Sequence, residues 1–212
     1  MMSAHGPPDA QATAGEVRSF VEDARRAQLV ACAIDVLAEL GFSQASSGRI
    51  AERAGVSRAL INYHFRGRED LIRAVVAEVY ARGLEHVGSR ILAQETQPAK
   101  LRAFIEGSID FYRAYPRHLQ ALRQIVLGAR TGPPPNRDRQ NREVSDVGEI
   151  LRDGQRAGEF RDFDPAIMAI TIRHALNGLL DEWYADPDLD LEAYRAELAD
   201  LFDAATRARG TT

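Results

Sequence analysis

The sequence has a single cysteine among its 212 residues, so the chain cannot form an internal disulfide. This is typical of proteins that fold in a reducing compartment, and we interpret Cys32 as a small buried residue of a helix. No apolar run is long enough to span a bilayer, and the first 15 residues lack the charged and apolar regions of a signal peptide. We therefore predict a cytoplasmic protein.

Residues that carry catalysis or bind metals are also sparse. The five histidines are scattered along the chain without metal-ligand spacing, and there is no phosphate-binding glycine loop, nucleophile elbow or Cys/His pair. Four carboxylates match the spacing of a calcium loop: Asp186, Asp188, Asp190 and Glu197. Leu191, however, stands where such a loop requires glycine, so we interpret the carboxylates as helix-capping residues. We predict no enzyme activity, no cofactor and no metal site.

Charge is distributed unevenly in a sequence of otherwise ordinary globular composition. The net charge is −4, with 45% hydrophobic and 27% charged residues. Residues 49–68 nevertheless carry five arginines and one glutamate, whereas residues 181–203 carry nine carboxylates and one arginine. This asymmetry favours an interaction of the basic end with phosphates while the acidic end stays away from them.

The basic segment, Ser46–Arg68, has the pattern of two short helices joined by a tight turn. Gly55 ends the first helix, because glycine adopts a left-handed conformation at little steric cost. Ser57 can cap the second helix, whose apolar residues Ile61 and Phe65 lie one turn apart on one face. The segment therefore predicts a helix-turn-helix, the motif that inserts its second helix into the major groove of DNA.

The outward side of that second helix is expected to contact DNA. Arg58, Ala59 and Asn62 are predicted to face base edges, because Arg and Asn form bidentate bonds to guanine and adenine and Ala can approach a thymine methyl. A second group is predicted to face phosphates, which fix register without reading sequence: Ser46, Ser47, Ser57, Tyr63, His64, Arg66 and Arg68. An alternative for Tyr63 and His64 is packing against the preceding helix.

The stretch RIAERAGVSRALINYHFRGREDLI, Arg49–Ile72, resembles the TetR family of transcriptional regulators. The resemblance covers about the first third of the chain and is architectural beyond residue 87. It implies an all-α protein with an N-terminal three-helix helix-turn-helix DNA-binding domain and a C-terminal helical-bundle domain for ligand binding and dimerisation. Leu60 and Asn62 depart from residues that are frequent in the family, so the operator sequence does not carry over.

Helical periodicity extends over most of the chain. It predicts helices over residues 17–40, 67–91, 97–115, 116–126, 143–156, 165–184 and 191–205, with an exposed loop over 128–142. We expect a disordered N-terminal arm at residues 1–15, because this stretch holds little apolar material. The DNA-binding domain is predicted at residues 16–70 and the ligand-binding and dimerisation domain at residues 71–212.

An apolar small-molecule site is predicted inside the second domain, lined by aromatic rings with a few polar tips. Its candidate residues are Phe104, Phe111, Tyr112, Tyr115, His118, Leu119, His174 and Trp183. An aromatic stripe at helical spacing is also typical of an ordinary core, so for each residue alone packing is the alternative.

The last two predicted helices are the candidates for a dimer interface. The helix over residues 165–184 is apolar on two faces, which requires cover on two sides. The resemblance implies a four-helix interface between two copies, for which we predict Ile172, Leu176, Leu180, Leu198, Leu201 and Phe202. The alternative is that both helices belong to the core of a monomer.

These patterns together indicate a DNA-binding transcriptional regulator. The resemblance implies a homodimer that binds a palindromic operator on double-stranded DNA, acts as a repressor and is released by a small-molecule effector, with no membrane partner. One alternative is a helical enzyme or small-molecule-binding protein whose helix-turn-helix is only structural. Another is an effector-independent regulator or an activator.

Overall fold

The computed structural model describes residues 14–128 and 137–208, with the backbone alone described for residues 14–20 and 137–146. Within these ranges the protein is all-α, as predicted, apart from an isolated β-bridge between Phe160 and Arg207. The helices are α1 (Ala14–Leu40), α2 (Ser47–Ala54), α3 (Arg58–His64), α4 (Arg68–Leu92), α5 (Gln97–Ala114), α6 (Pro116–Gly128), α7 (Arg137–Arg156), α8 (Pro165–Ala185) and α9 (Leu191–Thr206).

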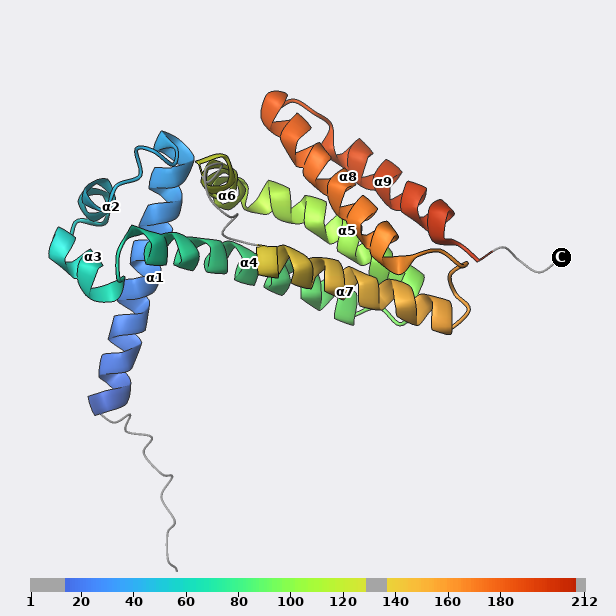
Figure 1. Ribbon diagram of the computed structural model, residues 1–212, viewed down its shortest axis with the longest axis horizontal. Helices are drawn as coiled ribbons and strands as arrows, with labels where there is room; N and C mark the ends of the chain where they lie inside the picture. Colours follow the sequence, from blue (N-terminus) through green and yellow to red (C-terminus); the bar gives the residue numbers. More distant parts are fainter. Residues whose placement is uncertain (1–13, 129–136, 209–212) are drawn as a thin grey trace, which may run out of the picture.

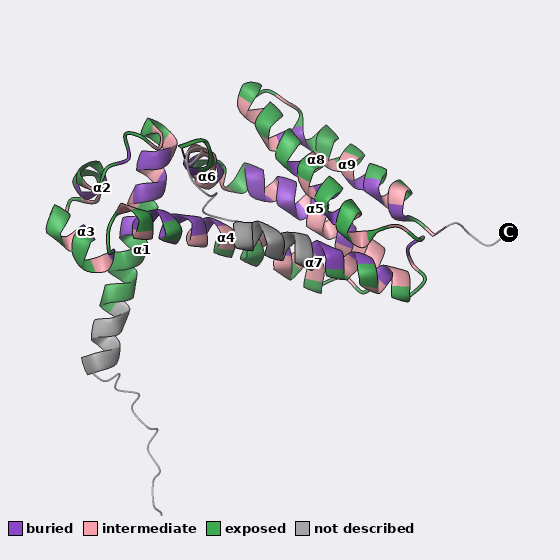
Figure 2. Ribbon diagram, viewed as in Figure 1, coloured by how far each residue is buried: buried purple, intermediate pink, exposed green. Residues whose placement is uncertain are grey.

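The helices form two groups joined by α4 (Figure 1). At one end, α2 packs against α1 and α3, and residues of α1 to α4 share one hydrophobic core. At the other end, α5 is covered by α4, α7, α8 and α9, and it is buried along much of its length (Figure 2). Because α4 runs from the first group into the second, it is a continuous physical link between them.

The helix positions agree closely with the periodicity of the sequence, with two differences. Helix α7 begins at Arg137, so residues 137–142 are helical and not part of the predicted loop. Helix α1 includes residues 14 and 15, which we assigned to the N-terminal arm. The remainder of that arm, residues 1–13, and loop residues 129–136 lie outside the described residues.

Carboxylates cap the starts of the last two helices, and of the four carboxylates that we interpreted as helix-capping residues, Asp190 caps α9 with its side chain. The side chain of Asp164 accepts hydrogen bonds from the backbone N–H groups of Ala166 and Ile167 at the start of α8. Asp190 accepts in the same way from Glu192 and Ala193 at the start of α9. The caps satisfy N–H groups that the helix itself leaves without partners, which fixes where each helix begins.

The first hydrophobic core lies under the helix-turn-helix and includes a contribution from α6. Leu29, Leu37 and Ile50 are fully buried there together with residues of α3 and α4. Ala121 and Ile125 of α6 are buried in the same core. Helix α6 is distant in sequence from residues 16–70, yet its inner face completes their core.

A second core fills the space among α5, α7, α8 and α9, with Ile105, Leu151 and Ile172 among its fully buried residues. A smaller aromatic cluster lies between the two cores. None of the helices in the described part of the chain has an apolar stretch long enough to cross a bilayer.

Candidate DNA-binding interface and ligand site

The turn between α2 and α3 has the geometry that its sequence predicts. Gly55 adopts a left-handed conformation with φ of 65°, and the N–H of Val56 donates to the carbonyl of Ala51 over 3.0 Å. Ser57 caps α3 by accepting a hydrogen bond from the N–H of Leu60 over 3.3 Å. A side chain at residue 55 would strain this backbone, so the glycine fixes the angle at which α3 leaves the turn.

Two fully buried side chains attach α3 to the first core. Ile61 is 2% exposed and Phe65, which follows the last turn of α3, is 1% exposed. Ile61 and Phe65 are buried, whereas Arg58, Ala59 and Asn62 are all exposed. The three residues predicted to read base edges therefore form one solvent-exposed surface on a short, firmly anchored helix.

Six of the residues predicted to face phosphates surround this surface. Ser46 and Ser57 accept capping bonds from backbone N–H groups, which leaves each hydroxyl hydrogen free to donate to a phosphate oxygen. Tyr63 is 70% exposed, and its hydroxyl donates to Glu22 of α1 over 3.3 Å. Ser47 and His64 are half-buried, and Arg66 is exposed.

Arg68 differs from these six in that the structure also gives its guanidinium partners within the chain. Its Nε donates to the carbonyl of Ala45 over 3.2 Å and its Nη2 to the carbonyl of Phe42. The guanidinium also lies 4.1 Å from the centre of the Phe42 ring. These contacts occupy Arg68 in holding the α1–α2 loop against the start of α4, so we interpret it as a structural residue.

Helix α6 is attached to the DNA-binding helices at both of its ends. Near its start, Nη1 of Arg117 lies 2.9 Å from Oδ1 of Asp35 and 3.2 Å from Oε1 of Glu39. Arg53 of α2 also pairs with Glu39, and this hydrogen bond is the main reason that the pKa of Glu39 is lowered. At its end, Gly128 packs so closely on Phe42 that a methyl group there would overlap the ring.

Five of the predicted ligand-site residues meet in the aromatic cluster. They are Phe111, Tyr112, Tyr115, Leu119 and Trp183, and they pack with Val79 of α4. His118 lies beside them, with its ring edge-on to Tyr115 at 5.3 Å between centroids. Burial lowers the pKa of His118, which favours the neutral imidazole.

The two remaining ligand-site candidates lie outside the aromatic cluster. Phe104 packs against the second core, and His174 is exposed on the outer side of α8. Sequence reasoning also missed His86, whose ring centroid lies 5.9 Å from that of Phe111 and whose Nε2 is buried without a hydrogen-bond partner. His86 follows Val79 by seven residues and therefore lies on the same face of α4, and this spacing could have predicted that His86 lies near the aromatic cluster.

An open cleft of about 400 Å³ lies next to the aromatic cluster and shares Trp183 with it. It lies between the end of α5 and the loop from α8 to α9. Its lining residues are Arg113, Trp183, Leu189, Asp190, Leu191 and Glu192. Trp183 is the only tryptophan of the chain, so its fluorescence reports directly on this region.

The predicted dimer residues divide into two groups. Ile172, Leu176 and Phe202 are at most 4% exposed within the core of the same chain, so they are unavailable to a partner and this part of the prediction needs correction. Leu180 and Leu198 are half-buried. Leu201 is 59% exposed, and Ile167 and Ile170 of α8 and Tyr194 of α9 are also large apolar residues that stay exposed on these two helices.

Comparison with known proteins gives consistent results for sequence and fold. The family of bacterial regulatory proteins named tetR matches residues 29–75. The HTH-type transcriptional regulator BetI of Cronobacter sakazakii is 25% identical over 177 residues, which are 82% of this chain and 85% of that protein. BetI of Pectobacterium carotovorum is 34% identical over 88 residues, which are 41% of this chain and 45% of that protein.

Solved structures share the whole fold. The crystal structure of AibR in complex with isovaleryl coenzyme A and operator DNA superposes with a TM-score of 0.67, at 19% identity, over 85% of this chain and 97% of AibR. At this identity the likeness demonstrates the fold. Residues 29–75, which include the helix-turn-helix, therefore match the domain of bacterial regulatory proteins of the tetR family, and over most of its length the chain is similar to the transcriptional regulator BetI.

Proposed function

We propose that this protein is a repressor that binds a palindromic operator as a homodimer and leaves the DNA when a small molecule binds its second domain. The observation that carries the proposal is the exposed surface of α3. Arg58, Ala59 and Asn62 are exposed together, while Ile61 and Phe65 hold the helix from behind. A rigid helix with Arg and Asn on its free side has the chemistry needed to read the major groove.

In this proposal Arg58 and Asn62 bind base edges and the neighbouring residues position the protein. Ser46, Ser47, Ser57, Tyr63, His64 and Arg66 contact phosphates. Arg68 stabilises the start of α4 through its bonds to the carbonyls of Ala45 and Phe42. Only the first group distinguishes one operator from another, because phosphates are the same in every sequence.

The proposed homodimer forms through the apolar surface of α8 and α9. Ile167 is 65% exposed, Ile170 46%, Leu201 59% and Tyr194 42%. Large apolar side chains that stay exposed on two helices in contact favour a protein partner over water. A two-fold pair is also the usual arrangement for this motif, because two reading helices about 34 Å apart cover adjacent major grooves on one side of DNA.

The proposed effector site is the aromatic cluster and the cleft beside it. The cluster touches both α4 and α6, through Val79 and Leu119, and these helices extend to the DNA-binding core. AibR, which has the same fold, binds both isovaleryl coenzyme A and operator DNA. Releasing a repressor from 99% bound to 1% bound requires an effector that prefers the released state by about 5.5 kcal/mol.

The reading surface can be tested with two arginines of similar exposure. Arg58→Ala is expected to lower operator affinity by roughly 1–3 kcal/mol and to relax preference at one base pair. Arg66→Ala is expected to weaken binding to all sequences alike and to reduce the salt dependence of log K by about one unit. Mobility shifts on operator variants at several salt concentrations measure both. An equal, sequence-independent loss in the two variants would contradict the assignment of the reading surface.

The effector can be tested by screening metabolites for thermal stabilisation. An effector at a hundred times its dissociation constant should raise the free energy of unfolding by about 2.7 kcal/mol. The same compound should change the fluorescence of Trp183 and displace the protein from its operator. A compound that stabilises the protein without affecting DNA binding contradicts effector control and favours the carrier or effector-independent alternative.

A further inference from the structure

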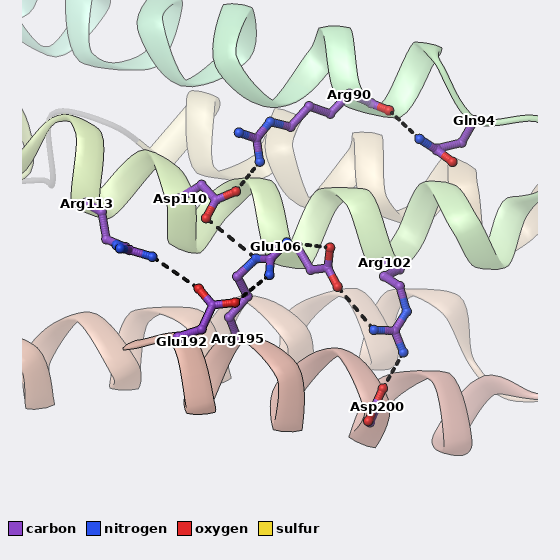
Figure 3. Close-up of polar contacts among 9 residues, drawn as sticks. All are labelled: Arg90, Gln94, Arg102, Glu106, Asp110, Arg113, Glu192, Arg195 and Asp200. Atoms are coloured by element: carbon purple, nitrogen blue, oxygen red, sulfur yellow. Dashed lines mark hydrogen bonds and ion pairs between the residues drawn. The ribbon is translucent and has the colours of Figure 1, made fainter. Parts of the chain in front are cut away.

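A network of ion pairs joins α4, α5 and α9 (Figure 3). Its centre is Asp110 of α5, whose two carboxylate oxygens face different helices. Oδ2 pairs with Nη1 of Arg90 on α4, and Oδ1 lies 3.5 Å from Nε of Arg195 on α9. Asp110 therefore links the helix that leads to the DNA-binding end with a helix of the exposed apolar surface.

Glu106, one turn earlier on α5, provides a useful contrast. Its Oε2 lies 3.0 Å from Nη2 of Arg195 and its Oε1 lies 3.1 Å from Nη1 of Arg102. Arg195 belongs to α9 and Arg102 belongs to α5 itself, so Glu106 makes no link to α4 in the network of Figure 3. The side chains of Glu106 and Asp110 are both 23% exposed. The two carboxylates thus have equal exposure and share Arg195 as a partner, whereas the second partner is Arg90 of α4 for Asp110 and Arg102 of α5 for Glu106.

The contact with Arg90 is made where α4 and α5 cross closely. Gly107 is buried at this crossing, and a methyl group added to it would lie 3.4 Å from Cδ of Arg90 and 3.5 Å from Cγ1 of Val87. The glycine lets the two helices approach, and the Arg90–Asp110 pair lies beside this point. A close crossing with an ion pair on one side restricts how far α4 can tilt relative to α5.

We propose that Asp110 is a positioning residue for DNA recognition, which transmits the placement of α9 to α4 through Arg195 and Arg90. The proposal rests on the proposed homodimer, in which α8 and α9 of two copies meet. Arg90 and Arg68 are 22 residues apart on α4, which corresponds to about 33 Å along the helix axis. A tilt of about 5° at the crossing therefore displaces the DNA-binding end by roughly 3 Å.

A displacement of that size matters because it approaches the rise of one base pair, about 3.4 Å. In a two-fold dimer both reading helices move, so the separation between them changes by more than one displacement. We therefore expect Asp110 to determine how much the affinity of the dimer for DNA falls when the spacing between the two half-sites changes. Because the pairs are partly exposed, removing one is expected to loosen this geometry without unfolding the protein.

The test compares Asp110→Asn with Glu106→Gln as the matched control. The wild-type protein first selects a two-fold site from random duplexes, and spacings one base pair longer and shorter are then built from it. We expect the wild type and Glu106→Gln to prefer the selected spacing by about tenfold or more, a difference of about 1.4 kcal/mol. Asp110→Asn should reduce that preference to below about threefold while remaining dimeric in sedimentation.

Arg90→Gln removes the same ion pair by changing its partner on α4. It should also reduce the preference for one half-site spacing, and it provides the test if Asp110→Asn folds poorly. The inference would be overturned if Asp110→Asn and Arg90→Gln kept the wild-type preference for the selected spacing, or if Glu106→Gln lost that preference equally. Neither result would contradict the proposal that the protein is a dimeric repressor. A wild-type protein that selects no two-fold site would overturn the operator proposal together with this inference.

Discussion

Leu201→Arg is expected to convert the protein from dimers to monomers and to lower its affinity for a two-fold operator by on the order of 10²- to 10⁴-fold. Leu201 is 59% exposed on α9 and is one of four large apolar residues on the outer surface of α8 and α9. In a two-fold interface the same surface meets itself, so one substitution introduces two guanidinium groups. Both would have to lose water where apolar side chains otherwise meet.

The loss of affinity follows from the linkage between two half-sites. When one helix-turn-helix of a dimer is bound, the second is held near its own half-site at a high effective concentration, and a monomer loses this advantage. Each separate α3 should keep its base preference, because Leu201 belongs to α9 and Arg58 to the opposite end of the molecule (Figure 1).

Sedimentation and mobility shifts on full and half operators measure the two effects. Leu92→Arg is the control, because Leu92 is 86% exposed at the end of α4 and lies outside the α8–α9 surface. It should leave both dimerisation and operator affinity unchanged. If Leu201→Arg remains dimeric, the proposed interface is on the wrong surface. If it is monomeric yet binds the full operator normally, the two-fold mode of binding is wrong.

The interface illustrates what sequence patterns can and cannot specify. The sequence identified two apolar faces on α8, and the structure buries only the face with Ile172 and Leu176. The other face, with Ile167 and Ile170, stays exposed. Periodicity predicts which residues share a face, but which face meets the chain's own core depends on how α5 and α7 pack against it.

The helix-turn-helix was predictable almost residue by residue because its determinants are local. Gly55 and Ser57 control backbone conformation within a few residues of themselves, and Ile61 and Phe65 are one turn apart. The role of Arg68 was not predictable in this way. Its partners are the carbonyls of Ala45 and Phe42, which are more than 20 residues away in the chain.

The aromatic cluster falls between these cases. Phe111, Tyr112 and Tyr115 lie within a little more than one turn of α5, so the sequence grouped them correctly. Phe104 lies two turns before Phe111 on the same helix, yet it reaches a different core because α5 spans both. His174 was grouped by chemistry alone, and the rotation of α8 leaves it exposed.

Because α6 contributes to the first core, a substitution on its buried face is expected to have a large effect on the stability of the protein. Ile125→Ala is expected to lower the free energy of unfolding by about 2–5 kcal/mol, the usual cost of emptying a fully buried isoleucine site. Ile125 has no exposed surface and belongs to the core that also holds residues of α1 to α4. Val126→Ala is the matched control on the same helix, because Val126 is 46% exposed and its truncation should cost about 0.5 kcal/mol or less.

Denaturant unfolding measures the total loss, and hydrogen exchange locates it. If α6 is part of the first core, Ile125→Ala should accelerate exchange in α1 and α3 at least as strongly as in α8 and α9. Accelerated exchange confined to α5 and α8 would contradict this, and so would an equal loss in Val126→Ala. The expected pattern has a consequence for regulation, because Leu122 of the same helix packs against both the first core and the aromatic cluster. A ligand that displaces the cluster then acts on the support of α3 directly through α6, in addition to any tilt of α4.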